Sequence, residues 1–272
     1  YFGLDSSMNL LLCLPVTFIA GIMMIVRAFV NKCNLIIEEP KSNPFIDVNE
    51  TIHFTAITPF QLFHSIDTIR SKEIRNIIVG GSEISAYLEG KVSELKTNVY
   101  ATYGMTETCS HVAIRSVNNP SNSDVYLAMD NITFSTDDQK CLIIHAPLIS
   151  DNPIYTNDCV ELIDKKRFRW LGRRDNIINS GGLKISPEWI EKKISTVLKY
   201  DYFISSIPDD ALGEKVVLVV ENSTIINKDE EFLNLKNILS KYEMPKDIVY
   251  VDKIIRSENG KILRKETMKK YR

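Results

Sequence analysis

The sequence predicts an α/β protein in two parts: a partial large domain with a mixed α/β sheet plus an antiparallel β region, then a small α+β C-terminal domain. In the first hundred residues or so, strand-like runs alternate with helical patterns, which is typical of a mostly parallel sheet. Short strand-like segments then follow one another from Val112 to Trp170, which indicates an antiparallel sheet or a small barrel attached to the α/β part. We place the large domain at residues 1–174 and the small domain at residues 175–272.

The first strand and helix form an unusually apolar stretch. Leu10–Val16 is expected to be a buried strand and Ala20–Val30 a buried helix. A membrane span is the alternative, but Pro15 and Gly21 interrupt the stretch and Arg27 lies near its end. We therefore expect no stable membrane insertion.

The remaining elements follow from apolar periodicity and turn residues. In the parallel region we expect strands Leu35–Ile37, Thr51–Ile57, Arg75–Val79 and Asn98–Tyr103, with helices Pro59–Arg70 and Ile84–Leu95. In the antiparallel region we expect strands Val112–Arg115, Ile132–Ser135, Cys141–His145, Cys159–Ile163 and Phe168–Trp170. In the small domain we expect helices Pro187–Leu198 and Glu230–Tyr242, strands Phe203–Ile207, Lys215–Glu221 and Ile248–Val251, and a basic terminal helix.

Composition narrows the class of protein. A formal net charge of −2 gives no general electrostatic reason to expect nucleic acid or an anionic membrane as partner. The 5 cysteines are odd in number, widely spaced and free of CxxC pairs, which favours a reducing cytoplasm over disulfides or zinc. The oligomeric state stays open, a homodimer included.

Two glycine-containing segments follow predicted strands that should end at one edge of the sheet. Gly80–Gly81–Ser82 lets the backbone approach a flat or anionic ligand closely, although strand–turn–helix joints often need glycine as well. In Tyr103–Thr108, Thr106 offers a hydroxyl for a phosphate oxygen and Glu107 a carboxylate for Mg²⁺. The alternative is a solvated β-turn. Ligands bind beyond the carboxyl ends of strands in such sheets, which favours a site.

Three later segments carry charge at turns. Tyr155–Asp158 presents a carboxylate that can accept hydrogen bonds from ribose hydroxyls. Taken by itself, this segment cannot be distinguished from an ordinary Asn-Asp turn. Gly172–Ile190 joins the two predicted domains and ends in a helix start at Ser186. Glu258–Lys261 is a turn that presents a lysine before Arg264 and Lys265. The alternative there is a solvated basic C-terminus.

Together these segments resemble the adenylate-forming acyl-CoA synthetase superfamily, which includes nonribosomal-peptide adenylation domains and luciferase. YGMTET is similar to its Y-G-x-T-E motif, GRRDNIINSGGLKISPEWIE to its hinge motif, and NGKILRK to its catalytic-lysine motif. YTND is similar to Y-x-T-G-D with one residue dropped. LCLPVTFIAGIMMIVRA and YGMTETCSHVAIR resemble the o-succinylbenzoate–CoA ligases of menaquinone biosynthesis.

The resemblance implies that ATP, with Mg²⁺, adenylates an acid and that CoA then displaces AMP to give a thioester. It assigns Lys261, Thr106 and Glu107 to catalysis, with Glu107 also holding Mg²⁺. Nucleotide-binding positions would be Gly80, Gly81, Ser82, Tyr103, Gly104, Met105, Asp158 and Arg173. Asp175 would be the hinge, and Gly181 and Gly182 would reach the CoA channel. The acyl pocket would include Phe18, Gly21, Arg27, Ser110 and His111.

Three departures from the family pattern matter. Phe18 stands where many relatives have a histidine that gates the acyl pocket, and Asn157 replaces a glycine beside the ribose-binding acid. The family's Gly-, Ser- and Thr-rich phosphate loop has no counterpart in this sequence, so we expect a fragment whose N-terminal part is missing. The alternatives are a ligase for another aromatic or fatty acid, or a non-catalytic AMP-binding remnant.

Overall fold

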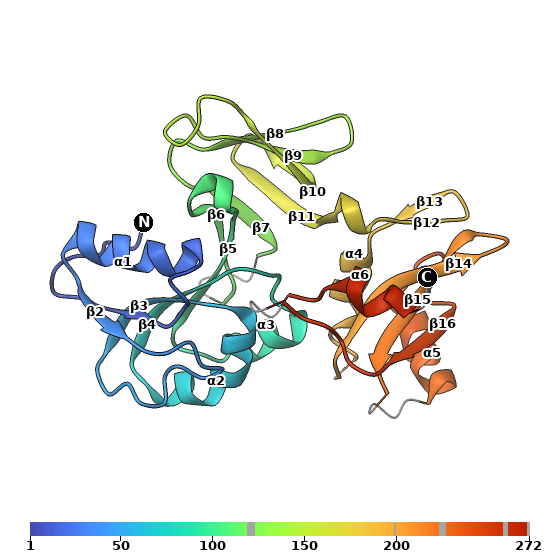
Figure 1. The fold of residues 1–272 in the computed structure, drawn as a ribbon, viewed down its shortest axis with the longest axis horizontal. Coiled ribbons are helices and arrows are strands. Elements are labelled where there is room, and N and C mark those ends of the chain that lie inside the picture. Colours follow the sequence, from blue (N-terminus) through green and yellow to red (C-terminus); the bar gives the residue numbers. More distant parts are fainter. Residues whose placement is uncertain (119–122, 199, 223–226, 258–260, 271–272) are drawn as a thin grey trace.

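The computed structural model describes residues 1–118, 123–198, 200–222, 227–257 and 261–270, and Figure 1 shows its fold. Its larger sheet has 11 strands in the order β2-β1-β3-β4-β5-β6-β7-β11-β10-β9-β8. The first five strands along the chain are β1 (Asn9–Leu12), β2 (Asn34–Ile37), β3 (Ile52–Ile57), β4 (Ile74–Val79) and β5 (Asn98–Gly104). These five strands pair in parallel.

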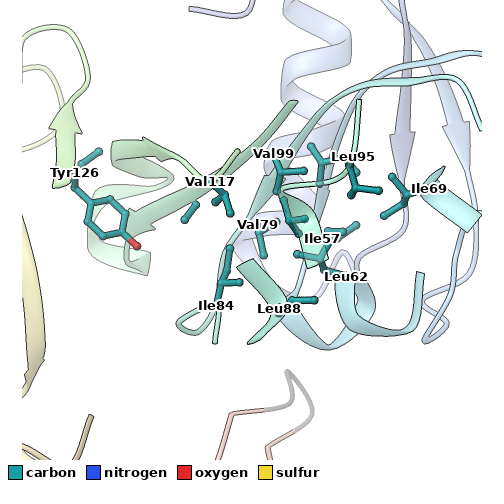
Figure 2. Close-up of a cluster of buried hydrophobic side chains, with 14 of the residues drawn as sticks. Ile57, Leu62, Ile69, Val79, Ile84, Leu88, Leu95, Val99, Val117 and Tyr126 are labelled. Carbon is teal, nitrogen blue, oxygen red and sulfur yellow. The ribbon is translucent and has the colours of Figure 1, made fainter. Parts of the chain in front are cut away.

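Helices cover both faces of this parallel part. Leu10 and Leu12 pack with residues of α1 (Ile19–Asn31), whereas Leu11 belongs to the core on the opposite face, as the two-residue period of a strand requires. That second core packs beneath α2 (Pro59–Ser71) and α3 (Ala86–Val92). Figure 2 shows its tight cluster of aliphatic side chains, with Leu62, Ile69 and Leu88 among those labelled.

The sheet becomes antiparallel after β5. The strands of this part are β6 (His111–Ser116), β7 (Val125–Ala128), β8 (Thr133–Thr136), β9 (Cys141–His145), β10 (Ile154–Asp164) and β11 (Arg167–Arg173). β7 pairs with both β6 and β11, so the antiparallel strands extend the parallel sheet instead of forming a separate barrel. Consequently the end of β5 lies near the strands that carry Asp158 and Arg173.

The C-terminal part has its own sheet of five strands. It consists of β12 (Ile178–Ser180), β13 (Leu183–Ile185), β14 (Tyr202–Asp209), β15 (Gly213–Glu221) and β16 (Asp247–Val251), with helices α4 (Pro187–Ile194), α5 (Lys228–Lys236) and α6 (Arg264–Thr267). Residues of α4 and α5 pack against one face of this sheet, and the chain around Met268 packs against the other. Figure 1 shows this unit beside the large sheet.

The predicted fold class is confirmed, but several boundaries were wrong. The first strand ends at Leu12, before Pro15, instead of at Val16. Helix α1 is buried on one face and exposed on the other, where the Phe29 side chain is 84% exposed. Helix α4 ends at Ile194 rather than Leu198, and α5 ends at Lys236 rather than Tyr242. β7, β12 and β13 were not predicted; each has three or four residues.

Within the described ranges, none of the helices has the length and apolar character needed to cross a bilayer.

Candidate active site

The structure places the two glycine turns side by side. β4 and β5 are parallel neighbours, so Gly80 and Gly104 lie at the same edge of the sheet. A Cβ on Gly80 would lie 2.7 Å from the Thr102 hydroxyl oxygen. A Cβ on Gly104 would lie 2.5 Å from the Ser110 carbonyl oxygen. Close packing therefore requires glycine at both positions, and at Gly81 a φ of +93° does so.

The turn after Gly104 displays two polar side chains to solvent. Thr108 is buried, and its hydroxyl donates to the carbonyl oxygens of Met105 and Ser110, at 2.9 and 2.7 Å. It also accepts the Met105 amide. Thr106 and Glu107 are exposed on this braced 3₁₀ turn. Among the residues that the structure describes, none forms a hydrogen bond or ion pair with the Glu107 carboxylate.

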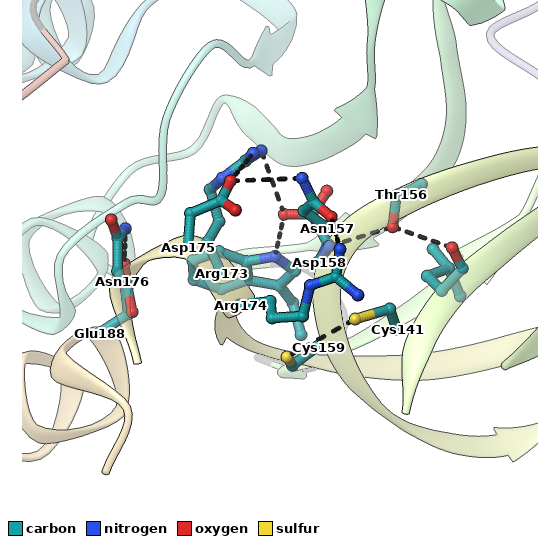
Figure 3. A network of polar contacts seen from close by, with 12 residues as sticks. Cys141, Thr156, Asn157, Asp158, Cys159, Arg173, Arg174, Asp175, Asn176 and Glu188 are labelled. Carbon is teal, nitrogen blue, oxygen red and sulfur yellow. Dashed lines mark hydrogen bonds and ion pairs between the residues drawn. The ribbon is translucent and has the colours of Figure 1, made fainter. Parts of the chain in front are cut away.

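Asp158 sits at the centre of a buried network, shown in Figure 3. Its carboxylate accepts hydrogen bonds from the Tyr103 hydroxyl at 2.7 Å and from the Trp170 indole N–H at 3.1 Å. Arg173, directly opposite on β11, approaches to 3.8 Å. Burial, reinforced by the Asp158 carboxylate, raises the pKa of Tyr103, so its hydroxyl stays a donor. These contacts leave acceptor capacity on Oδ2, which has one donor.

A second set of contacts surrounds Asp175. Its Oδ2 accepts from Arg173 at 2.9 Å and from the Asn157 side-chain amide at 3.3 Å. Arg174 in turn donates to Asn157 Oδ1 at 2.6 Å. The hydrogen bond to Arg173 is the main reason that the pKa of Asp175 is lowered. Thus Asn157, the departure from the family glycine, links strand β10 to the junction between the two sheets (Figure 3).

The proposed acyl-pocket residues meet in part. Arg27, on α1, donates to the Ser110 hydroxyl at 2.7 Å and lies 3.5 Å from His111 Nδ1. Burial, with a smaller effect from Arg27, lowers the pKa of His111 to about 4, so the imidazole is neutral at pH 7. Phe18 stands half-buried at the start of α1. Gly21 instead faces the chain itself, since a Cβ there would lie 2.3 Å from the Pro15 carbonyl oxygen.

The segment after β11 is held tightly to the start of α4. Gly172 has a φ of +137°, and a Cβ there would lie 2.5 Å from the Ser186 hydroxyl oxygen. That hydroxyl donates to the Leu171 carbonyl at 2.8 Å and caps the Trp189 amide. Gly181 and Gly182 form the two-residue turn between β12 and β13, and both have positive φ, as a hairpin turn of this kind demands.

Lys261 directly follows residues 258–260, which lie outside the described residues, and it belongs to a hairpin formed by antiparallel contacts between residues 255–257 and 261–263. Its backbone carbonyl accepts the Ser257 amide at 2.9 Å, and its side chain is exposed. The described contacts of Lys261 stay within this hairpin, so the structure does not bring it against Thr106 or Glu107.

No protein-family model matches the sequence. An AMP-forming acyl-CoA synthetase/AMP-acid ligase II-like protein of Dyadobacter fermentans is 33% identical, with 99% of this chain and 80% of that chain covered and a TM-score of 0.60. The chain belongs to the AMP-forming acyl-CoA synthetase family. The family resemblance drawn from the motifs is therefore confirmed.

Two more relatives of this family give the comparison its detail. The 2-succinylbenzoate–CoA ligase of Lactococcus lactis is 27% identical over 284 residues, which cover 97% of this chain and 62% of that protein. The o-succinylbenzoate coenzyme A synthetase of Bacillus subtilis, solved with ATP and a magnesium ion, shares the fold at a TM-score of 0.80 and 19% identity. That match covers 97% of this chain and 62% of that one, so the chain spans less than two thirds of these two relatives.

Within this acyl-CoA synthetase chain, the sequence motifs missed Trp170. It lies on β11 three residues before Arg173, and its indole binds the same carboxylate. A tryptophan at the end of a predicted strand, near a glycine, is only a weak signal for a binding-site residue. Its hydrogen-bond partner, Asp158, lies on another strand and cannot be recognised from the local sequence.

Proposed function

We propose that the protein is an acid–CoA ligase of menaquinone biosynthesis in the cytoplasm. It adenylates the aromatic acid o-succinylbenzoate with ATP and then forms the CoA thioester. The observation that carries the proposal is the meeting, at one sheet edge, of the exposed Thr106–Glu107 turn with the Tyr103–Asp158–Arg173 network. The gathered groups match those that a nucleotide requires: hydroxyl and carboxylate for phosphates, and an acid for the ribose.

Each group has a role that its surroundings support. Oδ2 of Asp158, which accepts one hydrogen bond from Tyr103, can accept a second from a ribose hydroxyl, and Arg173 approaches the other carboxylate oxygen. Gly80, Gly81 and Ser82 leave a flat backbone surface for the adenine, since side chains are small or missing there. The Thr106 hydroxyl donates to a phosphate oxygen.

Magnesium suits the donor set that the structure offers. Among the described residues there is no group of three or more potential metal ligands, and Glu107 is a single exposed carboxylate. Mg²⁺ is commonly held in this way, by one or two carboxylates together with substrate phosphates and water. When bound, the ion would neutralise phosphate charge. Glu107 and Thr106 would fix where that charge lies.

The proposed reaction has two steps, adenylation of the acid and formation of the thioester. In the first, a carboxylate oxygen of the acid forms a bond to the α-phosphorus of ATP, and the bond to the leaving pyrophosphate breaks. Negative charge grows on the phosphoryl oxygens, and Lys261 would supply the stabilising cation. In the second, the thiol sulfur of CoA attacks the acyl carbon, the thiol proton is lost, and AMP leaves.

Residues 175–272 would turn about Asp175 between the two steps, withdrawing Lys261 and bringing Gly181–Gly182 toward the CoA channel. Two features support this. Along the chain, the last strand of the larger sheet ends at Arg173 and the first strand of the smaller sheet begins at Ile178. The hydrophobic cores of the two sheets are built from separate residues. Closure of small domains around ligands is a common way to assemble and reset a site.

The acid is proposed from the Arg27–Ser110–His111 cluster. Arg27 is a partly buried cation whose guanidinium faces a hydroxyl and a neutral imidazole. Such a cluster suits a carboxylate that does not react, and o-succinylbenzoate has two carboxylates.

Separate assays of the two half-reactions test the proposal in the full-length protein. Lys261→Ala should lose adenylation, measured as pyrophosphate release, yet still convert supplied acyl-adenylate with CoA. Lys253→Ala, which changes another exposed lysine, serves as the matched control. Pyrophosphate release should depend on o-succinylbenzoate and not on benzoate or a fatty acid. AMP binding without thioester formation from any acid would favour a non-catalytic remnant.

A further inference from the structure

Arg264 departs from what the sequence led us to expect. It lies three residues after Lys261 in a basic run, for which a solvated surface is the usual interpretation. In the structure its side chain is only 16% exposed, whereas the neighbouring Lys265 is exposed. A buried arginine needs partners, because an unpaired charge removed from water is strongly unfavourable.

The partners come from elements far away in sequence. Both carboxylate oxygens of Glu191, on α4 and 73 residues earlier, accept from the guanidinium, at 2.5 and 2.7 Å. Arg264 also donates to the Ile204 carbonyl on β14 at 3.0 Å. Glu191 completes the ring by accepting the Ile204 amide at 2.6 Å. This two-pronged geometry uses the planar fork of arginine, which lysine lacks.

The same arginine approaches the segment between the two sheets. Glu188, on the first turn of α4, lies 3.8 Å from the guanidinium. Its Oε1 accepts the Asn176 side-chain amide at 2.5 Å, one residue after Asp175. Arg264 thus stands between two acids of α4, one of which binds the candidate hinge. Burial opposes its charge, but Glu191 and Glu188 more than offset this and raise the pKa of Arg264, which stays charged.

Arg264 also stands at the base of the hairpin that carries Lys261. Ile262 forms a bridge with Arg256, and the Leu263 amide donates to the Ile255 carbonyl at 2.8 Å. The chain enters α6 directly after these contacts, at Arg264. The position of the guanidinium therefore fixes where the hairpin leaves the small domain.

We infer that Arg264 is a positioning residue for adenylation. Its hydrogen bonds to Glu191 hold the base of the Lys261 hairpin against helix α4. When the small domain rotates about the proposed hinge, Lys261 therefore moves with α4 as one rigid body. The inference rests on the proposed function. Arg264 itself touches neither nucleotide nor acid. Without this pairing, Lys261 would no longer be held at one place relative to helix α4.

The test uses Arg264→Lys, which keeps the charge and loses the fork, and Glu191→Gln, which keeps the shape and weakens the acceptor. Arg167→Lys is the matched control, because Arg167 is an exposed arginine that pairs with Asp164 on the large sheet. Hydrogen exchange is measured at the amides of residues 255–257 and 261–263. Adenylation and the conversion of supplied acyl-adenylate are measured separately in the full-length protein.

We expect amide exchange in the hairpin to speed up at least tenfold in both variants, and adenylation to fall at least tenfold. Conversion of supplied acyl-adenylate should change less than twofold, because Lys261 takes no part in it. Equal losses in both half-reactions would show a general structural role and overturn the inference. Unchanged hairpin exchange would overturn it too. A wild-type protein that makes no adenylate would refute the proposed function, and hydrogen exchange would then still decide whether Arg264 clamps the hairpin.

Discussion

Replacing Asp158 by asparagine tests the network on which the proposed nucleotide site depends. The side chain is only 10% exposed, and its two oxygens accept from Tyr103 and Trp170 while Arg173 stands nearby. Asparagine keeps the shape but turns one acceptor into a donor. The amide oxygen can still accept from the Trp170 N–H, and the Tyr103 hydroxyl can rotate to accept from the new NH2 group, but neither hydrogen bond then involves a charged carboxylate.

The magnitude follows from these contacts. A hydrogen bond to a charged group contributes roughly 1.5–3 kcal/mol, and a buried donor left without its acceptor costs about 1–3 kcal/mol. Turning two hydrogen bonds to a charged group into neutral ones should lower the free energy of unfolding by about 2–3 kcal/mol. For a chain of this size that corresponds to a fall in Tm of roughly 4–6 °C.

The assays are calorimetric unfolding and titration with AMP. Tyr103→Phe is the control, because it removes one donor and leaves the carboxylate for the ribose. It should lower stability by about 1 kcal/mol and weaken AMP binding less than Asp158→Asn does. A Tm within one degree of wild type in Asp158→Asn would refute the stabilising role. Unchanged AMP affinity in a folded variant would refute the ribose assignment.

Three further predictions concern the neighbouring turn and pocket. Glu107→Gln should fold normally and lower adenylation by about a hundredfold, measured as pyrophosphate release, since it removes the charge that would hold Mg²⁺; wild-type release would contradict this. Ser110→Ala should weaken binding of o-succinylbenzoate about tenfold or more and leave an acid without the second carboxylate unaffected, measured by titration; equal effects on both acids would argue against the pocket. For His111, the folded pKa of about 4 lies below the ordinary histidine value of 6.5, so the unfolded chain takes up the proton first as pH falls. Stability should therefore decline from pH 6.5 toward pH 4, and His111→Asn should flatten that slope in urea unfolding; an unchanged slope would assign it to other groups.

Local signals predicted the elements that local interactions build. Helix α2 begins where Thr58 and Gln61 cap each other's backbone and Pro59 takes the first helical position, all of which is visible in sequence. Strand β7 was missed because it has only four residues, too few to show a period, and one of its two partners, β11, lies about 40 residues further along the chain. Short strands of this kind are specified by their partners.

The candidate site, like the fold, has features that local sequence indicates and features that depend on distant partners. The family resemblance assigned Tyr103 and Asp158 to one nucleotide site, and in the structure these two side chains are in contact although they are 55 residues apart. The sequence did not predict that Arg264 would be buried, because a run of basic residues does not indicate that Glu191, on another helix, binds one of them. Nor did it show that Gly21 faces the Pro15 carbonyl, since a glycine in a helical pattern gives no indication of its packing partner.

The hydrogen bond from Trp170 to Asp158 gives the protein an optical reporter. The chain has 2 tryptophans, and the other, Trp189, lies on α4 with Lys193 5.4 Å from its ring. Each indole therefore belongs to a different sheet unit. A Trp189→Phe variant would emit from beside Asp158 alone, and a Trp170→Phe variant from helix α4 alone. Comparing the two emission spectra during titration with a nucleotide would separate events at this carboxylate from motion of α4, which follows the proposed hinge.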